Sequence, residues 1–273
     1  MKPHKLLFYF IAFTFASCSK AQEESIYIFE NVNVLSMSKE EVLENQTLVI
    51  KDGRIIDIAT TTEYTSDNII DTKGKYLMPT LADAHIYLPE EEIDFEKMMK
   101  LNVLNRITKI RSMRGNWEDI TRKEKYNTSE SYYPKLYISP PVLHRSYELS
   151  YEDLEEYVLA AKNHGFDFIK ILSIKDDETL RNLNELSEKH EVAIGGHFPF
   201  NPQGSSISDE LIFSKNYTST EHLGGLIGDS DNLEARISYI KNKDVYVCPT
   251  LQWYAIGYGQ YEIDEMLNLF LNL

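Results

Sequence analysis

The chain has 273 residues, of which 42% are hydrophobic and 26% are charged. This composition excludes a disordered chain, because it supplies enough apolar surface for a large core. The formal net charge of -15 excludes a nucleic-acid partner from the expected functions, since phosphate binding requires a basic surface.

Residues 1–17 have the features of a secretory signal peptide. Two lysines precede an apolar run over residues 6–16, and small residues lie directly before Cys18. The run is shorter than the roughly 20 residues that cross a bilayer, but it fits the about 7–15 residues of a signal-peptide core. Residues 15–18 resemble the lipobox of bacterial lipoproteins, which implies lipidation of Cys18 and a membrane anchor facing the periplasm or cell surface. The alternative is an ordinary signal peptide with a chance cysteine.

A polar spacer over residues 18–25 leads into a small β-rich domain that we expect over residues 26–76. Its first segment, residues 26–35, is rich in β-branched and aromatic residues. Two further strand-like runs flank Asp52-Gly53, and this dipeptide is the strongest short hairpin signal that a sequence offers. We expect a β-sandwich-like unit.

From residue 77 onward, apolar runs alternate with charged helical segments, which is the pattern of βα units with a parallel sheet. Strands are predicted over residues 77–86, 103–110, 135–139, 166–172, 192–196, 217–221 and 245–250. Helices are predicted over residues 151–164, 177–190 and 233–241. Ser150 is a candidate N-cap with Asp153 three residues later, and Gly165 is a candidate C-cap.

Polar residues recur at nearly constant intervals at the ends of the later strands, namely Lys170, His197, His222 and Thr250. The intervals approach the roughly 30 residues of one unit in a (β/α)8 barrel, where the chemistry lies at the C-terminal strand ends. The predicted fold class is therefore α/β, an incomplete (β/α)8 TIM-type barrel of about seven βα units over residues 77–273. An eighth strand is missing, and residues 262–273 have a helical pattern, so we expect a truncated barrel.

Lys170 lies in the apolar run 166–172, and lysine is rarely buried without a partner. One interpretation is structural, with the ammonium group paired with a core acid or extended to the strand end. The other is chemical. Burial lowers the pKa of lysine, and the neutral amine reacts with carbon dioxide to form an anionic carbamate that can bridge two metal ions.

His197 follows two glycines at a predicted strand end, and His222 ends the next predicted strand. Either histidine alone would more often be a core or surface residue than a ligand. Their separation by one βα unit, downstream of Lys170, favours a shared metal site. Neutral imidazoles and an anionic bridge suit zinc or a similar divalent ion.

The first barrel strand ends in residues 83–87, where alternation places Asp83, His85 and Tyr87 on one face. Together with Lys170 and the two later histidines, this stretch resembles the amidohydrolase superfamily, in particular its imidazolonepropionase- and prolidase-related branch. The resemblance covers residues 26–252. It implies a hydrolase that uses a metal-activated water on carbon–nitrogen bonds outside large peptides, in a small amide, a cyclic amide or a dipeptide.

The resemblance also implies roles for individual residues. His85 would bind a first metal ion, Lys170 would be the bridging carbamate, and His197 with His222 would bind a second ion. Two parts of the family pattern are absent: Tyr87 stands in place of a histidine, and the catalytic aspartate of strand eight lies beyond the chain. A tyrosine with a pKa near 10 is a poor ligand unless the metal deprotonates it. We therefore expect one or two ions, preferentially on the side of Lys170, His197 and His222, and leave the catalytic base unassigned.

Three other residues have predicted roles outside metal binding. His144, after the third predicted barrel strand, and Tyr87 are candidate substrate contacts, and Cys248 is expected to be a buried structural thiol. The alternative to an enzyme is a non-catalytic amidohydrolase-like lipoprotein, either a binding module or a truncated remnant, with at most one metal ion.

Overall fold

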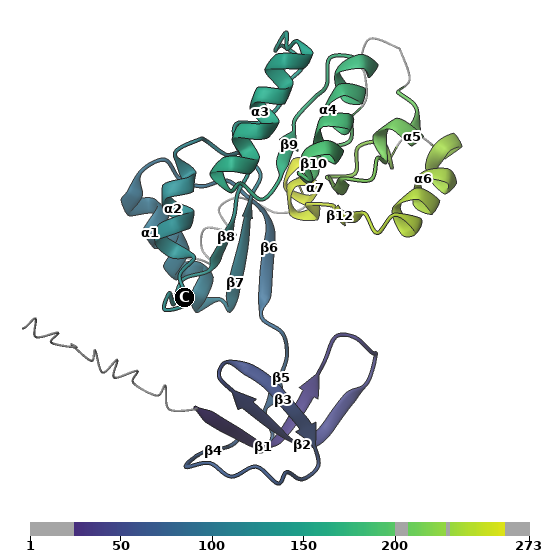
Figure 1. Ribbon diagram of the computed structural model, residues 1–273. Coiled ribbons are helices and arrows are strands. Elements are labelled where there is room, and N and C mark those ends of the chain that lie inside the picture. Colours follow the sequence, from purple (N-terminus) through teal and green to yellow (C-terminus); the bar gives the residue numbers. More distant parts are fainter. Residues whose placement is uncertain (1–24, 200–206, 228–229, 260–273) are drawn as a thin grey trace, which may run out of the picture. The chain divides into compact units, whose positions relative to one another are not determined.

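The computed structural model of the protein describes residues 25–199, 207–227 and 230–259 (Figure 1). The expected signal peptide, the lipidation site Cys18 and the C-terminal helical segment 262–273 lie outside the described residues. The chain divides into two compact units, residues 1–79 and 80–273. Within the described ranges, no helix has both the length and the apolarity needed to span a bilayer.

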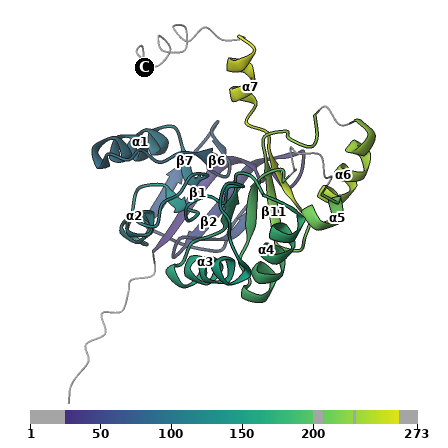
Figure 2. The same ribbon diagram turned by 90° about the horizontal axis from the view of Figure 1, so that it is seen from above.

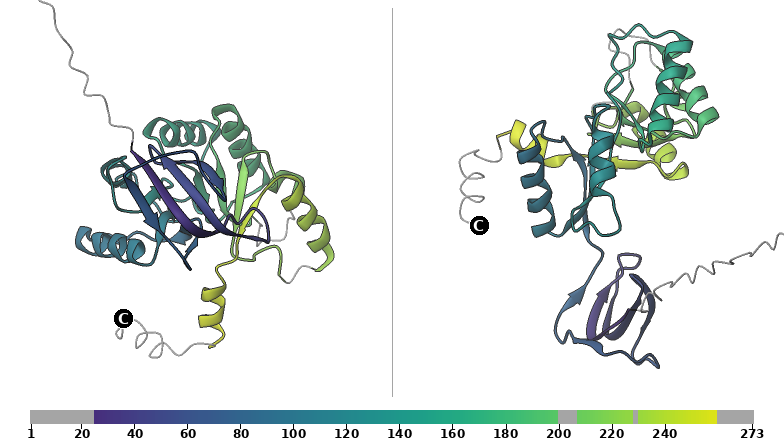
Figure 3. Two further views of the ribbon diagram at one scale, coloured as in Figure 1. Left: turned by 90° about the horizontal axis from the view of Figure 1, so that it is seen from below. Right: turned by 60° about the vertical axis from the view of Figure 1, so that its left-hand side comes forward.

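The N-terminal unit contains a five-stranded sheet of mixed direction, drawn in purple and blue in Figure 3. Its strands are β1 (Ile26–Leu35), β2 (Val42–Lys51), β3 (Arg54–Ala59), β4 (Asn68–Asp71) and β5 (Tyr76–Leu77). The order is β3-β2-β1-β4, with β5 also paired to β1. β1, β2 and β3 are antiparallel, whereas β4 and β5 run parallel to β1. The described residues of this unit therefore form one sheet rather than the two facing sheets of a sandwich.

The predicted hairpin is confirmed between β2 and β3. Asp52 and Gly53 have φ values of 50° and 74°, and two successive positive values are what a two-residue hairpin turn requires. Val32, Val34 and Leu48 are buried together and form the apolar core of the unit.

The C-terminal unit contains seven βα repeats within the described residues, which confirms an α/β fold with parallel strands. The strands are β6 (Leu81–Ile86), β7 (Ile107–Ser112), β8 (Lys135–Tyr137), β9 (Ile169–Ile171), β10 (Ile194–His197), β11 (Tyr217–Glu221) and β12 (Tyr246–Cys248). The helices are α1 (Glu92–Leu104), α2 (Asp119–Tyr126), α3 (Tyr151–His164), α4 (Asp177–His190), α5 (Asp209–Ile212), α6 (Ser230–Asn242) and α7 (Leu251–Gly257). In Figure 2, α1 to α6 lie around the outside of the parallel strands.

The parallel strands form two sheets, β6-β7-β8 and β9-β10-β11-β12, that meet at one seam. Just beyond β8, the backbone N–H of Leu143 donates to the carbonyl of Lys170, and the Leu143 carbonyl accepts from Leu172, both at 2.9 Å. The strands thus follow one another in barrel order. Among the described residues no strand pairs β12 with β6, so barrel closure is not observed there.

The predicted ends of α3 agree with the structure. At the start of α3, the Ser150 hydroxyl accepts the backbone N–H of Asp153 at 3.1 Å, and the Asp153 carboxylate accepts the N–H of Ser150 at 3.0 Å. Gly165 ends the helix with a φ of 84°, which only glycine adopts without strain. Such a cap stabilises a helix by typically about 1 kcal/mol.

The predicted strand boundaries differ from those observed, most of all at the first two barrel strands. Residues 103 and 104 belong to α1, and the strand begins only at Ile107. α1 buries Phe95 and Met99 but exposes Leu101 and Leu104, so its apolar residues do not mark one helical face. The predicted strand 77–86 is two strands, because the region around Pro79, which lacks an N–H for a ladder, separates β5 from β6.

Candidate metal centre

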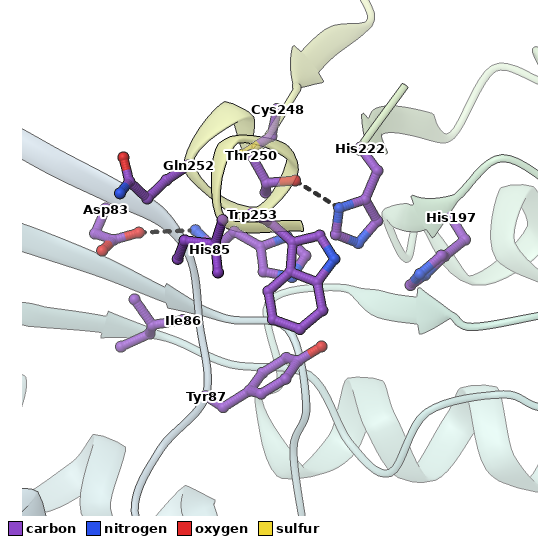
Figure 4. Close-up of a pocket in the computed structure, with 11 residues that line it drawn as sticks. Asp83, His85, Ile86, Tyr87, His197, His222, Cys248, Thr250, Gln252 and Trp253 are labelled. Carbon is purple, nitrogen blue, oxygen red and sulfur yellow. Dashed lines mark hydrogen bonds between the residues drawn. The ribbon is translucent and has the colours of Figure 1, made fainter. Parts of the chain in front are cut away.

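A cavity of about 620 Å³ lies at the C-terminal ends of β6, β10, β11 and β12 (Figure 4). It is lined by Asp83, His85, Ile86, Tyr87, His197, His222, Cys248, Thr250, Gln252, Trp253 and Ile256. This is the edge of a parallel barrel at which active sites occur. The structure thus brings together four of the residues for which the sequence predicted a metal or substrate role: His85, Tyr87, His197 and His222.

Three imidazole rings follow one another along this cavity. The ring centroids of His85 and His222 are 4.9 Å apart, and those of His222 and His197 are 4.6 Å apart. The Tyr87 ring lies 5.8 Å from that of His85. Side chains from β6, β10 and the end of β11 therefore converge on one site.

Two of the three histidines have one ring nitrogen already engaged. His85 Nδ1 lies 2.8 Å from a carboxylate oxygen of Glu221, and His222 Nδ1 lies 2.6 Å from the Thr250 hydroxyl. Metal-binding histidines are normally oriented in this way, through the nitrogen that does not bind the ion. For His197, Nδ1 is buried and has no hydrogen-bond partner among the described residues.

Lys170 on β9 is fully buried, and its Nζ has no hydrogen-bond partner among the described residues. Burial lowers the pKa of Lys170 to about 8, against the opposing effect of the Glu221 carboxylate. Burial, followed by the charge of Lys170, lowers the pKa of His197 to about 4. At neutral pH the imidazole is therefore neutral and a fraction of the amine is neutral, which are the protonation states that metal ligation and carbamate formation require.

Two glycines place His197 beside Lys170. Gly196 has a φ of 140°, and a Cβ on it would lie 2.2 Å from the carbonyl oxygen of Ile171 in β9. Gly195 pairs with Lys170 in the ladder between β10 and β9, and a Cβ there would lie 2.5 Å from the Ser219 hydroxyl. The glycines therefore permit the close approach of β10 to both neighbouring strands.

The backbone is strained where β11 and β12 end. His222 and Thr250 have φ values of 63° and 47°, which are uncommon for residues other than glycine and exceptional for a β-branched one. The His222 N–H donates to the Cys248 carbonyl at 2.8 Å. Such conformations cost about 1–3 kcal/mol each and persist mainly at functional sites, where the surrounding structure imposes them.

Sequence reasoning missed the charged network behind His85. Glu221 is fully buried, and its Oε1 accepts hydrogen bonds at 3.0 Å from Arg111 and from the Ser219 hydroxyl. The Arg111 guanidinium also lies 4.4 Å from the centre of the Phe168 ring. Burial raises the pKa of Glu221, but the hydrogen bond from His85 and the Arg111 charge together hold it below its usual value. An acid inside a predicted parallel strand was the sequence signal for this network.

Cys248 differs from the expected buried structural thiol, since it is half-buried and lines the cavity. Three possible ligand atoms lie within 4.8 Å of one another, one each from His85, Glu221 and Cys248. Burial, followed by the charge of Glu221, raises the pKa of the Cys248 thiol to about 11. The thiol is therefore protonated at neutral pH in the metal-free protein.

The two candidate substrate contacts lie in different places. Tyr87 lines the cavity and is 55% exposed. His144 is not among the described residues that line it, and its Nδ1 lies 2.7 Å from the Ser146 hydroxyl.

Comparisons with known proteins find short segments of similar sequence and solved structures of similar fold. No protein-family model matches the chain. A segment of 61 residues is 41% identical to 5'-deoxyadenosine deaminase of Methanosarcina acetivorans and covers 22% of this chain and 14% of that enzyme. The structure of a Xaa-Pro dipeptidase with bound methionine in the active site has a TM-score of 0.68 at 14% identity, covering 88% of this chain and 70% of that one. An enamidase, described as a member of the amidohydrolase superfamily, has a TM-score of 0.57 at 22% identity, covering 86% and 69%.

The two kinds of likeness carry different weight. The match to the curated deaminase spans only 14% of its length. The solved structures align over most of this chain but at identities that establish the fold alone. The chain therefore shares the fold of the dipeptidase and enamidase structures over most of its length.

Proposed function

We propose that the protein is a metal-dependent hydrolase of the amidohydrolase type, acting on the carbon–nitrogen bond of a small amide, a cyclic amide or a dipeptide. The observation that carries this proposal is the fully buried Lys170, whose amine has no partner among the described residues, beside three convergent histidines. A structural lysine would be expected to have its charge paired. The reaction class is supported by the names of similar proteins, which include a dipeptidase, a deaminase and an enamidase.

The donor groups present fit a divalent cation such as zinc. His197 and His222, with Lys170 as its carbamate, would hold one ion, and His85 would belong to a second. Lys170 Nζ and His197 Nδ1, which have no hydrogen-bond partner among the described residues, are the groups that such an ion would satisfy. A bound ion of this kind lowers the pKa of water to about 7 and polarises a carbonyl oxygen.

The chain's own residues contribute orientation and shape. Glu221 and Thr250 hold the rings of His85 and His222 through Nδ1, which leaves each Nε2 available. Trp253 and Tyr87 present exposed aromatic side chains at the cavity, where they would contact an apolar part of the substrate. The cavity volume of about 620 Å³ falls within the roughly 300–1,000 Å³ typical of small-molecule sites.

The proposal is tested by metal analysis of the purified protein together with hydrolysis assays on dipeptides, cyclic amides and simple amides. We expect a bound divalent ion and hydrolysis of at least one class, with both reduced in His197→Ala. His164→Ala, at the exposed end of α3, is the matched control and is expected to retain both. Bound metal without any hydrolysis would favour the non-catalytic binding module, and a protein that takes up no divalent ion would refute the proposal.

A further inference from the structure

A second group of donor atoms lies on the β6 and β12 side of the cavity. His85 on β6, Glu221 at the end of β11 and Cys248 at the end of β12 each offer one ligand atom, and these atoms lie within 4.8 Å of one another. We infer that these three side chains form a metal site with a thiolate ligand. The site shares His85 with the second ion of the proposed function but includes none of Lys170, His197 and His222, and it does not depend on the proposed hydrolysis.

The contacts of Glu221 fix the direction of its carboxylate. Oε1 is held by Arg111 and Ser219, each at 3.0 Å. Oε2 faces His85 and shares a hydrogen bond with its Nδ1 at 2.8 Å. An ion bound between these two atoms would replace that hydrogen bond. Because Arg111 supplies a compensating positive charge, the buried carboxylate is stable in its ionised form and can serve as a ligand.

The sheet register places Cys248 beside this carboxylate. Glu221 and Cys248 are direct partners in the parallel ladder between β11 and β12, so their side chains point to the same face. Cys248 is half-buried and lines the same cavity as His85. An ion can therefore reach the thiol from solvent through that cavity, and this access is one requirement for a metal site.

The donor set defines the class of metal. Imidazole, carboxylate and thiolate together suit zinc and similar borderline ions, and they exclude magnesium and calcium, which prefer oxygen ligands alone. Three protein ligands leave the fourth tetrahedral position for water. Binding breaks the S–H bond of Cys248, forms a sulfur–metal bond and releases the proton to solvent.

Cobalt(II) tests this assignment, because a thiolate ligand gives cobalt an intense near-ultraviolet charge-transfer band that nitrogen and oxygen ligands do not. The full chain is titrated with cobalt(II) chloride and its absorption is recorded. We expect the band in the unaltered protein and its loss in Cys248→Ser. Cys18→Ser, which removes the only other cysteine of the chain, is the matched control and should retain the band.

Lys170→Met separates this inference from the proposed hydrolase, because it removes the other centre and should leave the band in place. Cobalt binding without the band in the unaltered protein, or a band that survives Cys248→Ser, would overturn the inference. Hydrolysis without the band would retain the proposed function and reject the thiolate site. A band without hydrolysis would retain the thiolate site and reject the proposed function.

Discussion

The two sides of the cavity hold their side chains in place by different means. On the β9–β11 side, Lys170 and His197 are positioned by continuous strand pairing and by the close approach that Gly196 permits. On the β6–β12 side, the strands are the outer members of their sheets, and His85 is positioned by the charged pair of Glu221 and Arg111. The difference predicts that backbone changes disrupt the first side and charge changes disrupt the second.

The largest effect is expected from Gly196→Ala. The φ of 140° and the 2.2 Å separation of a new Cβ from the Ile171 oxygen would force β10 away from β9. We expect a loss of at least about 3 kcal/mol in the free energy of unfolding, measured by urea denaturation. Gly224→Ala is the control, since its Cβ would lie 3.7 Å from the Phe198 Cβ, an ordinary contact. Equal unfolding midpoints for the two variants would show that close approach does not position this side.

Lys170→Met is expected to stabilise the metal-free protein. Because burial lowers the pKa of Lys170 from 10.5 to about 8, the unfolded chain binds a proton between these pH values that the folded chain does not. Stability therefore rises with pH across that window, and below it the folded protein carries a penalty on the order of 3 kcal/mol. The methionine variant should lack both the penalty and this pH dependence.

Urea denaturation at neutral pH and at about pH 10, in carbon dioxide-free buffer, measures this effect. Lys175→Met is the control, because Lys175 is half-exposed and only 3.8 Å from Glu148 at the surface, a pair worth at most about 1 kcal/mol. A less stable Lys170→Met protein at neutral pH would contradict the assignment of Lys170 as a buried amine without a partner in the described part of the chain.

The difference between the two sides of the cavity also explains which parts of the site the sequence could predict. Lys170, His197 and His222 recur with the βα period, so their convergence follows from the fold class alone. Local signals likewise predicted the hairpin at Asp52-Gly53 and the caps of α3. The Arg111–Glu221 contact joins residues 110 positions apart across the interior, and no local pattern marks such a pair.

Arg111→Gln tests the charged network that the sequence did not reveal. Loss of the guanidinium leaves Glu221 buried without its countercharge and releases the support of His85. We expect metal affinity on the β6 side to fall by about 10- to 100-fold, as for other outer-shell partners, measured by competition with a chelating dye. Lys109→Gln, an exposed position on the same strand, should leave the affinity unchanged. Equal losses in both variants would indicate a general charge effect rather than support of His85.

The smallest effect is expected at Tyr87. Its replacement by histidine would give the β6 side of the cavity two histidines, as the other side has in His197 and His222. Tyr87 is 55% exposed, so Tyr87→Phe should change the free energy of unfolding by no more than about 0.5 kcal/mol and leave metal affinity unaltered. Tyr87→His should raise the affinity, because its ring would stand beside that of His85, where the tyrosine ring is now 5.8 Å away. Isothermal titration with zinc distinguishes the variants. Weaker binding in Tyr87→Phe would instead make the phenol oxygen a ligand on the β6 side.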